Sequence, residues 1–358
     1  MRKICIILII VVILPLFSLS VSAEERVDEY VDEFRDVIPE EYKDIAADPD
    51  ALMGAVGIKG VLSEIISVLS GSKGEISSFF LTVLGALILM SLCSFGRERS
   101  EFSSVCVGII CSLLIFKVVS PAFGTVSDSL QKMSEFFSSL IPITVGVTAL
   151  GGGMAGSGAQ ASGMYGALAV LNGLGGEIFT SLSAFALAMS LLSSFGSDGI
   201  ASVARGIRSI FSWLLGIACA LVTGATSLQT FVASAADSAS MRAAKYMASG
   251  LIPAVGSTVS GALSTLASGL SYAKGIIGAG AIFVMISTVL SALVILLAYR
   301  AALSLGIILA DFIGCSGAAR IFSAYRFSLD TVVAVYCLSS VVCVFQIILF
   351  IKIGVALL

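Results

Sequence analysis

The sequence predicts an all-α protein, a polytopic bundle of transmembrane helices. Hydrophobic residues make up 58% of the 358 residues and charged residues only 12%, whereas a soluble domain is roughly 45–50% apolar and about 25% charged. The mean hydropathy is +1.07. A water-soluble fold of this length could not bury so much apolar surface, and the apolar residues gather in runs that suit membrane spans.

The first 23 residues are typical of a secretory signal peptide. The start is basic (Arg2, Lys3), residues 4–16 are apolar, and residues 21–23, Val-Ser-Ala, supply the small residues of a cleavage site. The apolar core is short for a span, which favours cleavage after Ala23 over an uncleaved anchor. We therefore expect the mature N-terminus to lie outside the cytoplasm.

Residues 24–75 form an acidic segment. Between residues 24 and 50 there are twelve acids and three bases, whereas from residue 51 onward fifteen bases outnumber eleven acids. Apolar residues recur at helical spacing at Val27, Tyr30, Val31, Phe34, Val37 and Ile38. We expect a short exported amphipathic helix. It either docks to an exported partner or serves as a solvated leader that keeps the N-terminus on the outer face.

The membrane domain is expected over residues 76–358. Clear apolar runs cover residues 79–95, 102–116, 178–192, 210–222, 276–298 and 331–351. Weaker runs, rich in Gly, Ser and Ala, cover residues 140–155, 164–174, 251–270 and 301–313. Because a helical span needs about 20 residues, we expect some of the weak runs to be re-entrant or broken.

Arginines beside the spans predict the orientation. Those that follow or end a clear run are Arg97, Arg99, Arg205, Arg208 and Arg300. The positive-inside rule places them in the cytoplasm. The mixed-charge stretches 128–135 and 237–245 are then expected to be loops on the outer side. The side of Arg320 and Arg326 stays open.

Two stretches of the chain resemble each other, which indicates an internal repeat. Residues 90–96 are similar to residues 189–196, each copy precedes an arginine pair, and Leu-Ile-Pro follows later at 140–142 and at 251–253. The two halves cover about residues 79–175 and 178–275. Since both arginine pairs face the cytoplasm, the repeat is parallel. Short Gly/Pro-broken segments at matching places favour a conduit, and close helix packing is the alternative.

The sequence carries no recognisable enzyme active site. There is no histidine, so the commonest general base and metal ligand is missing. The glycine-rich residues 151–158 lack the Gly-Lys-Ser/Thr ending of a phosphate loop. The cysteines form no Cys-x-x-Cys pair and are expected to pack as small buried residues. We expect no cofactor, no metal and, without a basic aromatic patch, no nucleic-acid partner.

Ionisable residues at membrane depth are functional candidates by default. Those within or beside apolar runs are Lys117, Glu177, Lys274, Asp311 and Lys352. The three lysines lie near segment ends and are expected to extend to the interface. Asp311 lies among apolar neighbours, and we expect it to pair with Arg300 or Arg320 or to line a polar path.

Residues 234–256 carry the most specific pattern. Ala235-Ala236, Asp237, Met241-Arg242, Ala244-Lys245-Tyr246 and the run from Ile252 through Pro253 to Gly256 resemble the stage III sporulation protein AE family. The signal peptide, the exported segment and the Leu-Ile-Pro stretch with Pro142 agree with this resemblance. The last quarter departs from the family, because residues 308–314 lack the usual proline. The motif residues are the candidate functional site: Asp237, Arg242, Lys245, Tyr246, Pro253 and Gly256, with Pro142 and Asp311.

The resemblance implies a non-enzymatic membrane subunit of a sporulation complex, a channel or secretion-like assembly between mother cell and forespore. Its implied place is the mother-cell membrane around the forespore. The implied partners are the lipid bilayer, a cytoplasmic secretion-type ATPase and ring-forming proteins. The alternative is a stand-alone secondary transporter or permease with its site at the repeat interface. The sparse charges at membrane depth favour the assembly subunit.

Overall fold

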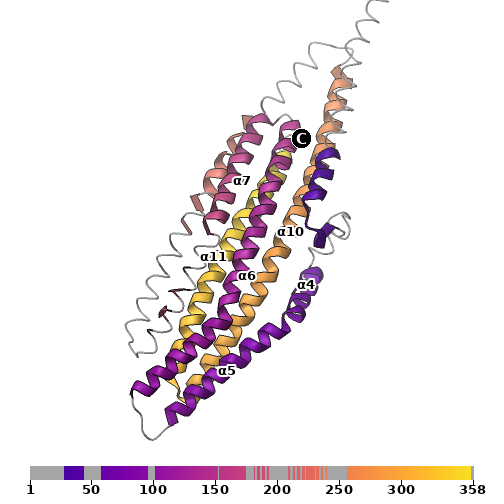
Figure 1. Cartoon of the computed structure of the whole chain (residues 1–358). Coiled ribbons are helices and arrows are strands. Elements are labelled where there is room, and N and C mark those ends of the chain that lie inside the picture. Colours follow the sequence, from indigo (N-terminus) through magenta and orange to yellow (C-terminus); the bar gives the residue numbers. More distant parts are fainter. Residues whose placement is uncertain are drawn as a thin grey trace, which may run out of the picture.

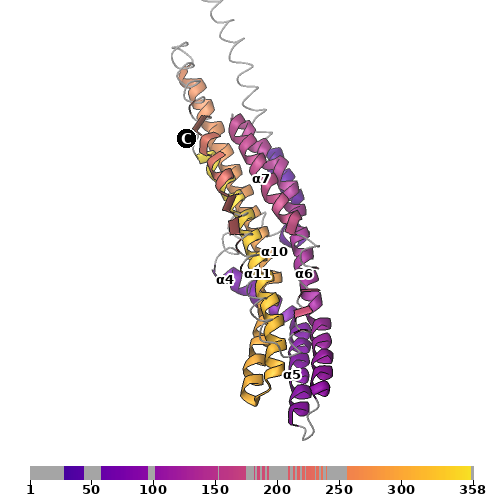
Figure 2. The same ribbon diagram turned by 90° about the vertical axis from the view of Figure 1, so that its left-hand side faces the viewer.

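The computed structural model describes residues 28–43, 58–95, 101–151, 153–174 and 256–355, and scattered residues between 181 and 239. Every regular element in these stretches is helical, and Figures 1 and 2 show an elongated bundle. Four described helices are long and apolar enough to cross a membrane, with spans at Lys73–Cys93, Val105–Leu150, Ser268–Ile313 and Ser316–Lys352. The prediction of an all-α polytopic membrane protein is confirmed at this level.

Two helical hairpins dominate the bundle. Helix α5 (Lys73–Phe95) follows the short α4 (Ile58–Gly71) and pairs with α6 (Glu101–Leu150). Helix α10 (Gly256–Ile313) pairs with α11 (Ser316–Val355), and this is the most extensive contact between any two described helices. The domain boundary expected after residue 75 falls inside α5.

Helix α6 is much longer than a membrane span. Its 50 residues extend about 75 Å, whereas the hydrocarbon core of a bilayer is about 30 Å thick. The helix continues through Pro121 and Pro142 and ends at Leu150. Helix α7 (Met154–Leu174) then folds back along it. Gly151 lies in the turn between these two helices.

The turn between α10 and α11 is a helix cap built on one glycine. Gly314 has φ +78°, a left-handed conformation that favours glycine. Its N–H donates to the carbonyl of Asp311 at 3.1 Å, and the N–H of Cys315 donates to the carbonyl of Ala310 at 2.8 Å. These two bonds are those of a Schellman motif. The stretch that departs from the family pattern thus ends α10 without a proline.

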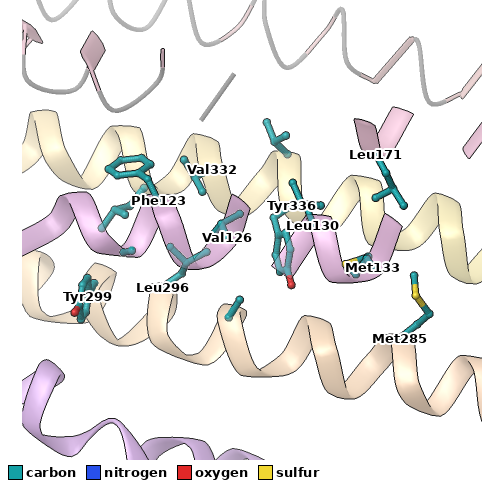
Figure 3. Packing of buried hydrophobic residues seen from close by; sticks show 14 of the residues in the cluster. Phe123, Val126, Leu130, Met133, Leu171, Met285, Leu296, Tyr299, Val332 and Tyr336 are labelled. Carbon is teal, nitrogen blue, oxygen red and sulfur yellow. The ribbon is translucent and has the colours of Figure 1, made fainter. Parts of the chain in front are cut away.

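The core lies where α6 is enclosed by α10 and α11. Figure 3 shows side chains of α6, among them Phe123, Val126 and Leu130, between Val332 and Tyr336 of α11 and Leu296 of α10. Such packing is the main force that holds helices together in lipid, since lipid is as apolar as the side chains themselves.

The acidic N-terminal segment packs on this bundle. Residues 28–37 are helical, and Phe34 and Ile38 on their apolar face are buried. A Cβ at Gly280 of α10 would lie 2.8 Å from the Phe34 ring, and one at Gly146 of α6 would lie 2.5 Å from the Tyr30 ring. A helix with the predicted amphipathic spacing is therefore present at residues 28–37, and its apolar face packs against this chain. The exported location stays a prediction.

Several apolar runs that the sequence separates are joined in the structure. The runs at 276–298 and 301–313 form one helix, α10, and the runs at 102–116 and 140–150 belong to α6. The expectation of a loop at 128–135 is wrong, because α6 is helical there, and α10 continues past Arg300. Charged residues interrupt hydropathy without interrupting helix geometry, because the apolar side of each helix stays packed. The second half of the proposed repeat lies largely outside the described residues.

Candidate functional site on helix α6

Helix α6 carries a polar face on the outside of the bundle. Its exposed polar residues between the two prolines recur at steps of three and four, and they are Thr125, Asp128, Gln131, Lys132, Glu135, Ser138 and Ser139. We call this set the α6 polar face. Positions three and four apart share one side of a helix, so the face is continuous over about four turns.

The opposite side of the same stretch is buried. Its members are Ala122, Phe123, Val126, Ser129, Leu130, Met133, Phe136, Phe137, Leu140 and Ile141. Such a division between polar and apolar sides is typical of a helix that meets water or a polar partner. It differs from α5, whose exposed residues include Leu81, Ile88 and Leu92.

Prolines at both ends add backbone polarity to this side of the helix. Pro121 and Pro142 are exposed, and a proline cannot donate to the carbonyl four residues earlier. The carbonyls of Lys117 and Ser138 therefore lose their helical partner. The hydroxyl of Thr125 donates to the carbonyl of Pro121 at 3.1 Å. An exposed helix surface with freed carbonyls suits water far better than hydrocarbon.

Polar contacts across the bundle hold the face in place. The Ser129 hydroxyl lies 2.5 Å from the Tyr336 hydroxyl of α11 and donates to the carbonyl of Thr288 of α10 at 3.2 Å. At the edge of the face, the Ser134 hydroxyl donates to Asn172 Oδ1 of α7 at 2.6 Å. Rotation of α6 about its axis would break these bonds, so the polar side is held outward.

The charges on the face alternate in sign. Asp128, Lys132 and Glu135 follow each other at spacings of four and three, and Gln131 donates to Glu135 Oε1 at 2.9 Å. The face is thus polar and nearly neutral. It lacks the concentrated charge that would bind one ion tightly, and the described residues contain no group of three or more potential metal ligands. Its chemistry suits a hydrated surface.

The structure separates the predicted site residues. Pro142 lies at the end of the α6 polar face, and Gly256 begins α10. Asp311 is exposed in the last turn of α10, and its carbonyl caps that helix. Asp237, Arg242, Lys245, Tyr246 and Pro253 lie outside the described residues, as does Glu177. No shared site for Pro142 and Asp311 exists, since they lie near opposite ends of the bundle.

Arg300 has a different partner from the one expected. It forms an ion pair with Asp330 of α11, and Arg326 approaches the same carboxylate at 4.0 Å. This pair could not be predicted from the sequence, because Arg300 and Asp330 lie thirty residues apart and on different helices. The only sequence feature that could have indicated the pair is the presence of an arginine and an aspartate in two consecutive apolar helices.

Lys274 also departs from its prediction. Its side chain is 1% exposed, and its Nζ lies 5.7 Å from the centre of the Phe350 ring of α11. It therefore does not extend to an interface. A cation over an aromatic face is stabilised by the ring quadrupole, and that contact depends on the pairing of α10 with α11.

Comparison with known proteins identifies one family. The family model described as Stage III sporulation protein AE matches residues 52–356. No curated protein matches this chain, and no solved structure matches it either. The match covers most of the chain, including α4 to α11 and the sequence motif at 234–256.

Proposed function

The chain belongs to the stage III sporulation protein AE family, and on that premise we propose that it is a non-enzymatic membrane subunit of a channel or secretion-like complex. This complex would connect mother cell and forespore. The chain would lie in the mother-cell membrane around the forespore, with its mature N-terminus outside the cytoplasm. A cytoplasmic secretion-type ATPase and ring-forming proteins are the proposed partners.

The α6 polar face is the observation that carries this proposal. A polar side of a helix is costly against lipid, yet here it lies on the exterior of a bundle whose described residues include four helices apolar and long enough to cross a membrane. It therefore needs water or another protein beside it. A subunit of a conduit meets that need, because neighbouring subunits enclose a wet space that each of them lines.

The same observation argues against a stand-alone permease. A permease that works alone encloses its polar path within its own helices. In the described part of the chain, the polar face points away from the bundle, and between the two prolines the side of α6 toward α10 and α11 is apolar except for Ser129. The proposed role thus requires assembly.

The proposal is tested by purifying a tagged chain from membranes of its own host during spore formation and identifying the proteins that come with it. We expect a secretion-type ATPase and ring-forming proteins. Recovery of the chain alone would overturn the proposal and make solute-uptake assays the next step.

A matched pair of variants connects this assay to α6. Asp128→Leu with Glu135→Leu replaces both carboxylates of the α6 polar face by apolar side chains, and we expect loss of partners and of spores at normal protein levels. Glu29→Leu with Glu33→Leu makes the same chemical change at exposed positions of the N-terminal helix. Equal losses in both variants would show that the α6 polar face has no special role.

A further inference from the structure

One end of the bundle presents an apolar exterior. This four-helix end consists of α5 with residues 101–116 of α6, 299–313 of α10 and 316–330 of α11. Tyr299 stacks on Phe79 with ring centres 4.3 Å apart, and Tyr325 donates to the carbonyl of Ser112 at 2.7 Å. Its exposed large apolar residues are Leu81, Ile88, Leu89, Leu92, Ile110, Leu113, Leu114, Leu305, Ile308, Leu309, Phe312 and Ile313.

These side chains require an apolar environment. They lie on three helices, α5, α6 and α10. Exposed apolar surface of this extent is typical of a membrane-facing surface. Arg300 lies thirteen residues before the end of α10, which is a distance of about 20 Å along the helix axis. This is shorter than the hydrocarbon core of a bilayer, which is about 30 Å thick. If a bilayer surrounds the four-helix end, the side chains of Arg300 and Arg326 reach one headgroup layer by extending along the bundle.

The cluster has one carboxylate for two guanidinium groups. The side chains of Arg300 and Arg326 are 42% and 40% exposed, whereas that of Asp330 is only 16% exposed. Arg326 approaches Asp330 at 4.0 Å, beyond the range of a hydrogen bond. A net positive charge thus stays on the membrane-facing surface. Leu297, three residues before Arg300 and on the same helix face, is exposed as well.

We propose that Arg300 and Arg326 bind the phosphate of an anionic lipid headgroup. An unneutralised guanidinium beside hydrocarbon is costly, and a long arginine side chain can extend toward the headgroups. The planar guanidinium forms paired hydrogen bonds with phosphate oxygens. Asp330 positions both arginines and leaves one positive charge for the lipid. The site rests only on the membrane character of the chain and not on its proposed part in a conduit.

The first test compares lipids on the purified full-length chain in detergent. Addition of phosphatidylglycerol should raise the melting temperature, whereas equal phosphatidylcholine should not. Native mass spectrometry of the unmodified chain should show retained phosphatidylglycerol in preference to phosphatidylcholine. Equal stabilisation by the two lipids would overturn the proposal. A full shift with inorganic phosphate alone would indicate a site for the free anion and overturn the assignment to lipid.

Variants then locate the site. Arg326→Gln removes the surplus charge and keeps the Arg300–Asp330 pair, and we expect phosphatidylglycerol to bind about tenfold more weakly, as for loss of a charge-assisted hydrogen bond. Lys352→Gln removes a positive charge from an exposed position of the same helix and should keep the lipid effect. Asp330→Asn frees both arginines and should strengthen it. An unchanged lipid effect in Arg326→Gln would overturn the site.

Discussion

The hydroxyl groups of Ser129 on α6 and Tyr336 on α11 lie 2.5 Å apart. Ser129 also donates to the carbonyl of Thr288 on α10, and Tyr336 lies 3.4 Å from the same oxygen. Three helices thus meet at one buried polar point in the core. Because hydrogen bonds require one orientation and apolar packing tolerates several, this point sets the rotation of α6 and therefore the direction of its polar face.

Replacement of Tyr336 by phenylalanine tests this relationship. We expect a loss of about 0.6–1.5 kcal/mol of stability, since one bond between helices is removed and the ring is kept. Ser129→Ala should cost a similar amount. The double variant should cost less than the sum, because the two residues share one interaction. Thermal unfolding in detergent measures all three, and full additivity would contradict a direct bond.

Gly280 provides a test of the docked N-terminal helix. A leucine there would occupy the space of the Phe34 ring, so we expect residues 28–43 to detach and become sensitive to protease. Detachment exposes Phe34, whose burial is worth roughly 1.5–3 kcal/mol. Gly275→Leu is the control, because a Cβ added at Gly275 on α10 meets nothing within 4 Å. Equal protease sensitivity in the two variants would argue against the contact.

The α6 polar face predicts a pattern of chemical labelling. In a chain with its native cysteines replaced by alanine, Ser138→Cys should react with a membrane-impermeant maleimide, since its position is exposed and polar. Ser112→Cys, at a fully buried position of the same helix, should stay unlabelled. Labelling is to be compared from the two sides of the membrane. A failure of Ser138→Cys to react from either side would mean that lipid or protein covers the face.

The cap between α10 and α11 predicts a glycine requirement. Gly314→Ala places a side chain at φ +78°, and we expect it to destabilise the chain by about 1–2 kcal/mol. Gly314→Asn should cost less, since asparagine tolerates this conformation better. Gly74→Ala is the matched control, because Gly74 is helical in α5 with nothing within 4 Å of an added side chain. It should stabilise the helix by roughly 0.5–1 kcal/mol.

The sequence and the structure agree on the all-α class, and the family comparison agrees with the sequence motif. Composition alone predicts a membrane protein, and the motif at 234–256 predicts the family that the comparison identifies. The amphipathic helix that begins near Tyr30 follows from its spacing of apolar residues. The structure does not test the predicted site as a whole, because most of the motif lies outside the described residues. Pro142 and Asp311 are described, and they do not contact each other. Those residues remain candidates from sequence similarity.

Apolar runs by themselves determined that this chain folds as helices in a membrane, because burial in lipid requires internally bonded backbone and long apolar stretches. Only the tertiary structure decided where those helices begin and end. Hydropathy falls at Asp128 in α6 and at Arg300 in α10, yet both helices continue. The two helices pack their apolar sides against each other and against α11. The charged side chains lie on other sides, where Asp128 is exposed and Arg300 pairs with Asp330. The exposed side of α6, the carboxylate opposite Arg300 and the surface under Phe34 all depend on contacts between distant residues, which local pattern does not encode.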